Sequence, residues 1–301
     1  MTARRRALSG RGLLLLAGLT LGWGVNWPLM KISLTEIPPW TYRGITGALG
    51  TVGLILAARI AGASLRVSRT EWRPLIFAAL LNVSIWQVAV AYGIRLMASG
   101  YAAVLAFTMP LWAVALSALV LGERAGPRRL AGLALGMAAI AVLLSGDLEA
   151  LAVSPLGAAF ILLGALSWAS GVILIKQVRW SMPVLSLTVW TVGLGSVPVV
   201  ILAGLIEGFR IPEASNAAWA ATAFTIVVPF VLCYLAWFRI MALLPAGIAA
   251  ISTLMVPVVG VVSGALMLGE EPGWRGLTAL ALVMAALALV LIVPSVDAQN
   301  P

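Results

Sequence analysis

Residues 99–123 read SGYAAVLAFTMPLWAVALSALVLGE, and this stretch carries no charged residue before its final glutamate. A helix that crosses a bilayer needs about 20 predominantly apolar residues, so the stretch predicts one transmembrane span. Residues 246–270 read AGIAAISTLMVPVVGVVSGALMLGE and repeat its glycine, its proline and its Leu-Gly-Glu ending at the same places. The pair indicates a membrane protein that contains its folding unit twice.

The composition extends this prediction to the whole chain. Of the 301 residues, 62% are apolar and only 10% are charged, against roughly 25% charged residues in an ordinary soluble domain. The mean hydropathy is +1.09. A soluble fold could not bury that much apolar surface, so we expect lipid to be the solvent.

Ten apolar segments are long enough to cross the membrane, and they are too long for barrel strands. They cover residues 12–31, 39–60, 74–95, 99–121, 127–145, 154–175, 184–206, 217–240, 246–268 and 273–294. The sequence therefore predicts an all-α integral membrane protein with ten transmembrane helices. Its basic start resembles a signal peptide, but Trp23 and Asn26 stand where a cleavage site would need small residues, so we interpret it as an uncleaved first span.

The basic residues predict the orientation of these spans. With the amino terminus in the cytoplasm, fourteen of the nineteen Lys and Arg residues fall in inside connections and four fall in outside ones, while Arg43 lies within a span. This bias is the usual orientation signal of membrane proteins, and it predicts that both termini are cytoplasmic. The net charge of +9 is explained in this way and does not indicate a nucleic-acid partner.

The two halves of the chain, residues 1–147 and 148–301, contain five spans each and would together form one transport domain. The residues that match at offsets of 145 and 147 are uncommon in apolar spans: Trp23 with Trp168, Lys31 with Lys176, Pro38 with Pro183, Gly100 with Gly247, Pro110 with Pro257, and Glu123 with Glu270. The third and eighth spans match poorly, and a chance likeness between apolar segments is the alternative. Because five is odd, the second half would enter the membrane from the opposite side. Inverted repeats of this kind are typical of secondary transporters, in which one repeat rocks against the other around a midplane site.

The first span contains the motif Gly22-Trp23-Gly24-Val25-Asn26-Trp27-Pro28, and Arg43 follows soon after Pro38-Pro39. With the two Pro…Leu-Gly-Glu segments, these residues resemble the EamA-type exporters of the drug/metabolite transporter superfamily, over the whole chain and in two copies. The resemblance implies a multi-pass protein of the bacterial inner membrane that exports small metabolites, often amino acids. Within the family, the chain is most similar to the exporters of aromatic amino acids.

One face of the first span is a candidate for substrate binding. Trp23, Asn26 and Trp27 share this face by their helical spacing. An amide at membrane depth should face protein or water, and indoles pack well against apolar groups. The alternative is interhelical packing with one stabilising hydrogen bond. Pro28 removes a backbone donor from the same helix and predicts a local kink.

Residues of later spans are expected to complete the cavity, with hydrogen bonding between helices or core packing as the alternative for each. The third span contributes Asn82, Trp86 and Gln87. The amides of Asn82 and Gln87 are costly in lipid unless they are paired. The other candidates come from the fourth, sixth and eighth spans: Tyr101, Trp168, Ser170 and Tyr234. Tyr101 could equally anchor its span at the membrane surface.

Four further residues are candidates for a hinge or gate. Pro110 and Pro257 lie in the middle of their spans at symmetric positions, as Pro28 does in the first span, and predict flex points. Arg43 either extends to the membrane surface or attracts a carboxylate in an outward vestibule. Glu123 and Glu270 end their helices, and we expect each to accept hydrogen bonds from the first amides of the next helix.

The residues that the chain lacks narrow the function. It has no histidine, one cysteine (Cys233), and no Asp or Glu in the middle of a proposed span. We therefore expect no metal, no cofactor and no enzymatic activity, and we expect facilitated transport without an obligatory proton relay. A chamber of Trp, Tyr, Asn, Gln and Ser without a Lys and Arg cluster fits neutral or zwitterionic solutes, above all aromatic or large apolar amino acids.

Two alternatives remain open at this stage. One is a broad-specificity drug or metabolite exporter with proton antiport, and the other is a passive channel. The expected partners are a small-molecule substrate and membrane lipid, and the chain is expected to function as a monomer.

Overall fold

The computed structural model describes residues 10–122, 126–145, 154–208, 211–243 and 246–291, and every regular element in these ranges is helical. The helices are α1 (Gly10–Glu36), α2 (Pro39–Ile60), α3 (Trp72–Ala79), η1 (Leu80–Ile85), α4 (Trp86–Leu96), α5 (Ser99–Ala106), α6 (Met109–Leu121), α7 (Pro127–Leu144), α8 (Pro155–Gln177), α9 (Val184–Leu202), η2 (Ala203–Glu207), α10 (Asn216–Thr225), η3 (Ile226–Cys233), α11 (Tyr234–Leu243), α12 (Ala246–Leu268) and α13 (Gly273–Leu291). The three η elements are π-helical.

These elements form ten rods, one for each predicted span. Four rods are composite, namely α3-η1-α4, α5-α6, α9-η2 and α10-η3-α11. Among the described residues, seven rods are long and apolar enough to cross a membrane, and two shorter apolar helices cover Met255–Leu268 and Gly273–Leu289. The tenth rod is α1, which is 27 residues long. The prediction of an all-helical membrane protein with ten helices is confirmed.

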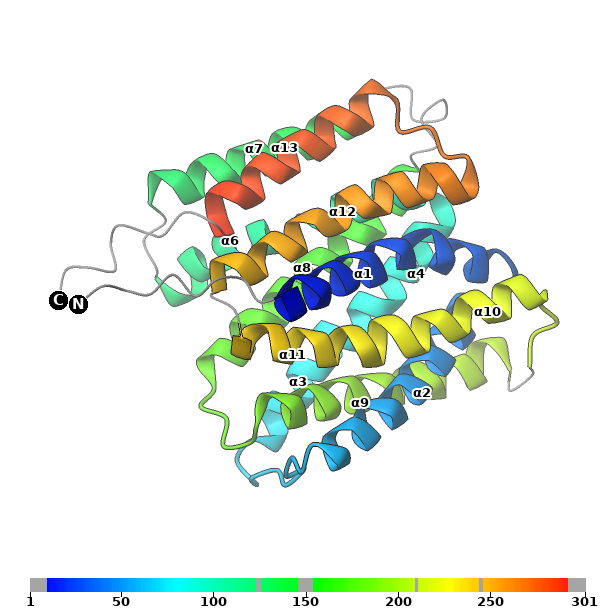
Figure 1. The fold of residues 1–301 in the computed structure, drawn as a ribbon, viewed down its shortest axis with the longest axis vertical. Helices are drawn as coiled ribbons and strands as arrows, with labels where there is room; N and C mark the ends of the chain where they lie inside the picture. Colours follow the sequence, from blue (N-terminus) through cyan, green and yellow to red (C-terminus); the bar gives the residue numbers. More distant parts are fainter. Residues whose placement is uncertain (1–9, 123–125, 146–153, 209–210, 244–245, 292–301) are drawn as a thin grey trace.

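The rods lie side by side with their axes roughly aligned (Figure 1). The most extensive pairings are α7 with α13, α1 with α12, α2 with α9, and α4 with α8, and each joins a helix of the first half to one of the second. α1 and α8, the first helices of the two halves, run in opposite directions (Figure 1). The two halves therefore share one body, because helices of each half pack against helices of the other.

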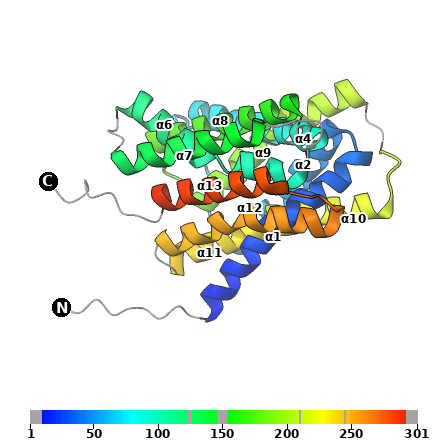
Figure 2. The same cartoon turned by 90° about the horizontal axis from the view of Figure 1, so that it is seen from above.

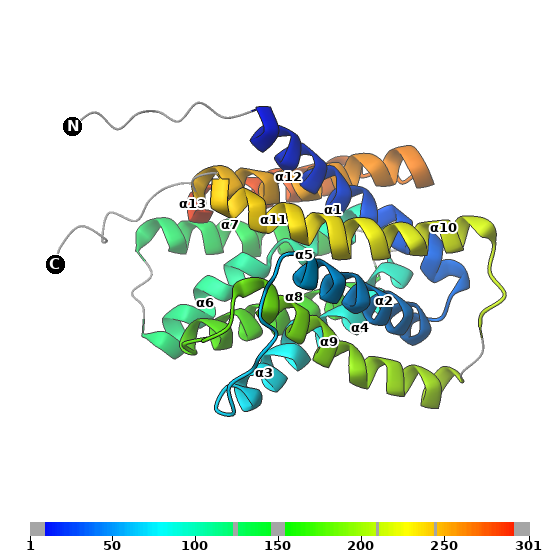
Figure 3. The same cartoon turned by 60° about the horizontal axis from the view of Figure 1, so that its bottom comes forward.

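The bundle has an inner end and an outer end. The inner end is where α1 begins and α13 ends, and the outer end is opposite (Figure 2). The starts of α2 and α10 and the end of α9 lie at the outer end (Figure 3). The basic connections predict that the inner end faces the cytoplasm.

The main core runs between the rods and contains large side chains such as Tyr42, Met97 and Leu105, which are at most 2% exposed. On the rim of the bundle, Leu119 and Leu266 are more than 80% exposed. Apolar side chains of this kind suit a surface that lies in lipid, because hydrocarbon solvates them at no cost.

The composite rods contain irregularities that the periodicity did not predict. The third and eighth spans, which match poorly in sequence, both carry a π-helical segment, η1 and η3. The fourth span breaks at Phe107 and Thr108, so Pro110 lies in the first turn of α6 and does not kink a continuous helix. Its counterpart Pro257 lies inside α12, which is unbroken. The two prolines are therefore not equivalent in structure, because Pro110 lies in a first turn, where proline loses no hydrogen bond, and their role as flex points stays a prediction.

Candidate substrate cavity

A cavity of about 660 Å³ lies between the two halves. Most of its wall is aromatic or apolar, with a few amides and basic groups. It is lined by Trp23, Asn26, Trp27, Met30, Arg43, Asn82, Val83, Trp86, Gln87, Val90, Phe107, Met109, Pro110, Ala113, Val114, Ser117, Arg129, Trp168, Val172, Lys176, Val192, Pro229, Phe230, Tyr234, Trp237, Val256 and Leu287. A concave, mainly apolar site with a few placed polar groups is typical of small-molecule binding.

Most of the residues predicted from the sequence come together in this cavity. From the first three spans these are Trp23, Asn26, Trp27, Arg43, Asn82, Trp86 and Gln87, and from later spans Pro110, Trp168 and Tyr234. The cavity draws on both halves of the chain, so neither half forms it alone.

Trp23 is the centre of an aromatic wall. Its ring meets Tyr234 edge to face, with the centroids 6.2 Å apart and the planes at 78°. The Trp237 ring lies at 6.2 Å on the same side of the wall. The indole nitrogen of Trp23 donates to the Pro229 carbonyl at 3.4 Å, inside η3. The π-helical segment thus leaves a carbonyl accessible to a side chain of the cavity, a use often seen for π-bulges.

Asn26 belongs to a polar chain that crosses from α2 to α10. The Tyr42 hydroxyl donates to Thr225 Oγ1 at 3.0 Å, and Thr225 Oγ1 donates to Asn26 Oδ1 at 2.7 Å. Thr225 was not predicted, since a threonine in an apolar span usually bonds only to its own helix. The chain fixes the amide of Asn26 so that its nitrogen can serve the cavity.

Asn82 is held in η1 by a bond across the halves. Its Nδ2 donates to the Trp168 carbonyl at 3.0 Å, while its Oδ1 is buried without a partner. The approach is possible because residue 171 is glycine. A Cβ atom at Gly171 would lie 2.0 Å from Asn82 Oδ1.

Gln87 is the second residue of α4, directly after η1, and is 5% exposed. Its Oε1 is a second buried amide oxygen without a partner. Native structures leave few buried acceptors unpaired, so the two oxygens on these lining residues are positions where a further donor would be stabilising.

Arg43 lines the outer part of the cavity and is 4% exposed. Its burial rules out the expectation that it extends to the membrane surface, while the alternative that it attracts a carboxylate stays a prediction. Its Nη2 contacts Met30 Sδ at 3.3 Å, and its Nε has no hydrogen-bond partner. The guanidinium is thus a buried cation directed at the central space.

Two predicted binding residues lie elsewhere. Tyr101 is 2% exposed, and its hydroxyl donates to the Pro272 carbonyl at the outer end, away from the lining. Ser170 is also absent from the lining, and its Oγ donates to the Leu166 carbonyl of its own helix at 2.9 Å. The sequence could not distinguish these roles, because both residues lie close to a cavity-facing position along their helices.

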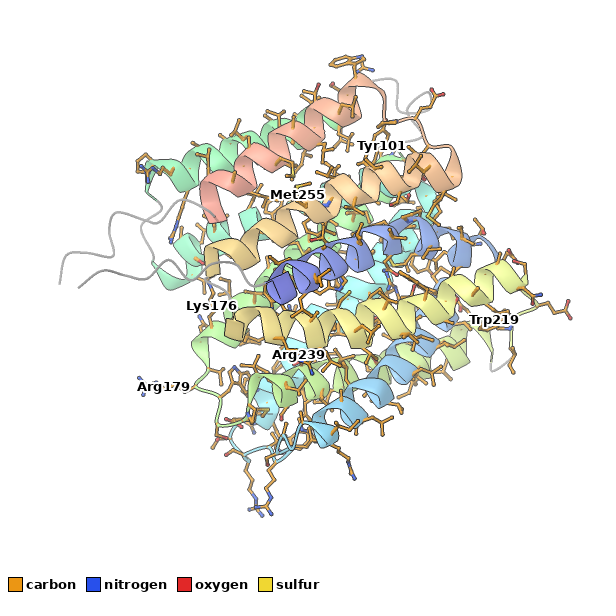
Figure 4. The ribbon with its side chains drawn as sticks, in the orientation of Figure 1. Tyr101, Lys176, Arg179, Trp219, Arg239 and Met255 are labelled. Carbon is orange, nitrogen blue, oxygen red and sulfur yellow. The ribbon has the colours of Figure 1, made fainter. Side chains whose placement is uncertain are left out.

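Two basic residues line the inner part of the cavity, where the sequence predicted none. Lys176 lies in the last turn of α8, and Arg129 lies in the first turn of α7. Figure 4 shows Lys176, Arg179 and Arg239 at the inner end and Tyr101 and Trp219 toward the outer end. With Arg43, all the charged groups in the described lining are basic, which corrects the expectation of a chamber without Lys and Arg.

The lining extends to Lys176 and Arg129 at the inner end, and toward the outer end it includes Met30 and Arg43 but none of the residues that join the helix ends there. At the outer end, Glu270 accepts from Ser99 N at 2.7 Å, from Ser99 Oγ at 2.8 Å and from Gly100 N at 3.0 Å. Lys31 lies 3.8 Å from the same carboxylate and donates to the Met97 carbonyl. Glu270 therefore caps α5 in the other half. The expectation that it binds the first amides of the helix that follows it is wrong. Glu123 lies outside the described residues.

Two other carboxylates at the outer end act in the same way. Glu207 accepts from Trp40 N at 3.2 Å and from Thr41 N at 2.7 Å, at the start of α2. Glu36 accepts from Ser215 N at 2.6 Å and from its hydroxyl at 2.7 Å, at the start of α10. Each carboxylate ends a helix of one half. Glu207 stabilises the first amides of α2, whereas Glu36 holds Ser215, the residue whose own hydroxyl caps α10.

The remaining hinge candidates have no role in the lining. Pro28 is buried inside α1, which continues past it, and Pro257 is inside α12 next to the lining residue Val256. In the described part of the chain, no three His, Cys, Asp or Glu side chains are grouped so that they could hold a metal ion.

Comparison with known proteins identifies relatives over nearly the whole chain. A model of the EamA-like transporter family matches residues 10–145 and again residues 155–292. The uncharacterized transporter YvbV of Bacillus subtilis is 29% identical over 93% of this chain and 91% of its own length. A probable amino-acid metabolite efflux pump of Salmonella typhimurium is 28% identical, with 88% and 89% covered. The uncharacterized inner membrane transporter YedA of Escherichia coli K12 is 26% identical, with 92% and 89% covered.

A solved crystal structure has the same fold. It superimposes with a TM-score of 0.65 at 20% sequence identity and covers 93% of this chain and 96% of its own. At that identity the likeness concerns the arrangement of helices alone.

Proposed function

The chain belongs to the EamA-like transporter family and is a multi-pass membrane protein, and from this premise we propose that it exports amino acids with aromatic or large apolar side chains. The observation that carries the proposal is the cavity, where an aromatic wall adjoins two unpaired amide oxygens and a buried cation. Indoles pack an apolar side chain, while the polar groups hold the two charges of a zwitterion.

The relatives support this substrate class. The Salmonella relative is named a probable amino-acid metabolite efflux pump. Because substrates change readily on one fold, the name supports the class and not a particular amino acid.

Alternating access between two inverted five-helix halves is the mechanism we favour. The opposite chain directions of α1 and α8, the sharing of the cavity by both halves, and a cavity lining that extends to the inner end all support it. In this proposal both termini are cytoplasmic, so the cavity faces the cytoplasm. One chain forms the whole cavity, which supports a functional monomer.

Transport is proposed to follow the substrate's own gradient. No Asp or Glu lines the described part of the cavity, and a proton-coupled carrier usually keeps a buried carboxylate or histidine as its relay. The basic lining also disfavours an exporter of cationic drugs, because like charges in a cavity of low polarity repel.

Counterflow in proteoliposomes tests the proposal. Vesicles loaded with unlabelled phenylalanine should accumulate labelled phenylalanine transiently, with saturation, and an imposed pH gradient should leave the rate unchanged. Leucine should compete, while glucose and tetraphenylphosphonium should not. Counterflow by none of twenty amino acids would contradict the substrate class, and a strict need for the pH gradient would contradict facilitated transport.

A further inference from the structure

Arg43 is a buried cation without a counter-charge. It lies in the second turn of α2, is 4% exposed and lines the cavity. Its neighbours are the Met30 sulfur at 3.3 Å from Nη2 and the Tyr42 ring, whose centroid is 5.4 Å from Cζ. Within the described part of the chain, Arg43 forms no ion pair, and the carboxylate of Glu270 pairs with Lys31 instead. A buried charge without a partner is costly, so proteins keep one where a ligand completes it.

The acidic groups at the outer end are already engaged. Glu207 lies at the start of α2, the helix that contains Arg43, and accepts hydrogen bonds from the amides of Trp40 and Thr41 and from the Thr41 hydroxyl. Glu36 and Glu270 bind the starts of α10 and α5. Among the described residues, no carboxylate pairs with Arg43, so a bound molecule in the cavity is the source of an anion that we consider.

Acceptors without donors lie in the same cavity. Gln87 Oε1 is near the face of α2 that carries Arg43, since a Cβ atom at Gly47, one turn beyond Arg43, would be 3.8 Å from that oxygen. Asn82 Oδ1 is the second buried acceptor without a partner. An ammonium group has three donors and no acceptor, so it fits such oxygens.

From this arrangement we infer that Arg43 binds the carboxylate of the cargo and that Gln87 Oε1 binds its ammonium group, whereas Asn82 Oδ1 packs against Gly171 of α8. Arginine suits the first role because its planar fork matches a carboxylate with two parallel hydrogen bonds. The inference rests on the proposed function and sharpens it. Cargo must carry a free carboxylate, and an amide or ester of the same amino acid is rejected.

The test compares four ligands that share one side chain: phenylalanine, phenylalanine amide, phenethylamine and 3-phenylpropionate. For the wild-type chain, phenylalanine should compete in counterflow roughly 100-fold better than its amide, the usual order of loss for one partner of a buried charge pair. Arg43→Gln should weaken phenylalanine by a similar factor and remove its advantage over the amide. Arg43→Lys, which keeps the charge but not the fork, should restore part of it. Arg179→Gln removes an exposed arginine outside the lining and should change nothing.

A second variant covers the case in which Arg43→Gln does not fold. Gln87→Met keeps the volume and removes the acceptor, so phenylalanine should lose most of its advantage over 3-phenylpropionate while it keeps its advantage over the amide. Unchanged selectivity in both Arg43→Lys and Gln87→Met would overturn the inference.

Ligand-induced thermal shifts separate this inference from the proposed function. If wild-type vesicles transport no amino acid but carboxylates still stabilise the purified chain through Arg43, the proposed function fails and the assignment of Arg43 stands. If phenylalanine is transported and Arg43→Gln keeps the wild-type selectivity, the function stands and the assignment fails. Stabilisation of the wild type by chloride alone, equal to that by 3-phenylpropionate, would make the Arg43 partner a structural anion and would also overturn the assignment.

Discussion

The two ends of the bundle are held together differently. At the outer end Glu207 and Glu270 each cap the start of a helix from the other half, and Glu36 holds Ser215, the cap of α10. At the inner end, Glu71 accepts from Ser181 N and Oγ, between the connections that precede α3 and α9. Glu71 and Ser181 do not line the cavity. The outer end is thus held by several separate polar contacts across the bundle, whereas the polar contact at the inner end lies to one side of the cavity.

Removal of two outer caps should have the largest effect on access to the cavity from the outer end. In Glu207→Ala/Glu270→Ala the loss of two helix caps costs the closed outer end about 2 kcal/mol, or roughly 30-fold in its equilibrium. A cysteine in place of the lining residue Val90, with Cys233→Ser as background, should then react about 30-fold faster with an impermeant maleimide from outside. Glu213→Ala is the control, because Glu213 is exposed in the connection before α10. Equal labelling in all variants would mean that the caps do not hold the outer end closed.

A change between the two ends should affect binding and leave the ends alone. In Gly171→Ala the new Cβ would lie 2.0 Å from Asn82 Oδ1, so the bond between Asn82 and Trp168 must be lost. Overpacking of this kind costs about 1–3 kcal/mol, so we expect roughly a tenfold weaker substrate. Counterflow affinity and the maleimide reaction measure the two effects separately. Gly18→Ala is the control, since no atom lies within 4 Å of its added Cβ.

A smaller effect is expected at Tyr101. Tyr101→Phe removes the donor to the Pro272 carbonyl, and one such bond contributes about 1 kcal/mol, so outside labelling should rise about fivefold. Substrate affinity should not change, because the side chain is outside the cavity lining. A marked loss of affinity with unchanged labelling would restore Tyr101 to the binding site.

The smallest effect should come from the inner end. Hydrogen bonds from Ser181, first from its backbone amide, hold the pKa of Glu71 below its ordinary value. A lowered pKa stabilises the fold above the ordinary pKa, and this contribution is lost as the pH falls through the lowered value. The midpoint of thermal unfolding of Glu71→Gln should therefore be slightly lower than that of the wild type at pH 7. Below the ordinary pKa of a glutamate, this midpoint should change less with pH than that of the wild type. Its outside labelling should stay at the wild-type rate.

The sequence was sufficient for the rods and for much of the cavity wall. Span lengths follow from bilayer thickness, and the face with Trp23 and Asn26 follows from helical spacing, so both were predictable. The role of Glu270 was not, because its partners Ser99 and Gly100 are far away in the chain and belong to the other half.

Other features depended on local geometry that a regular helix does not have. The segments η1 and η3 change which residues share a face, so the orientation of Asn82 and the exposed carbonyl of Pro229 could not be derived from a period of 3.6. The direction of the Arg43 side chain was equally hidden, because a helix gives its face but not the neighbour that this face meets.

If the protein is the passive carrier proposed above, the outer contacts have a consequence for its response to supply. A passive carrier must have the same ratio of Vmax to KM in both directions, yet its resting population can favour one side. With the outer end capped and the cavity lining extending to the inner end, the empty protein waits for cytoplasmic cargo, in the orientation proposed above. The rate of export then rises with the concentration of cargo in the cytoplasm, and uptake is slow when the external concentration is low.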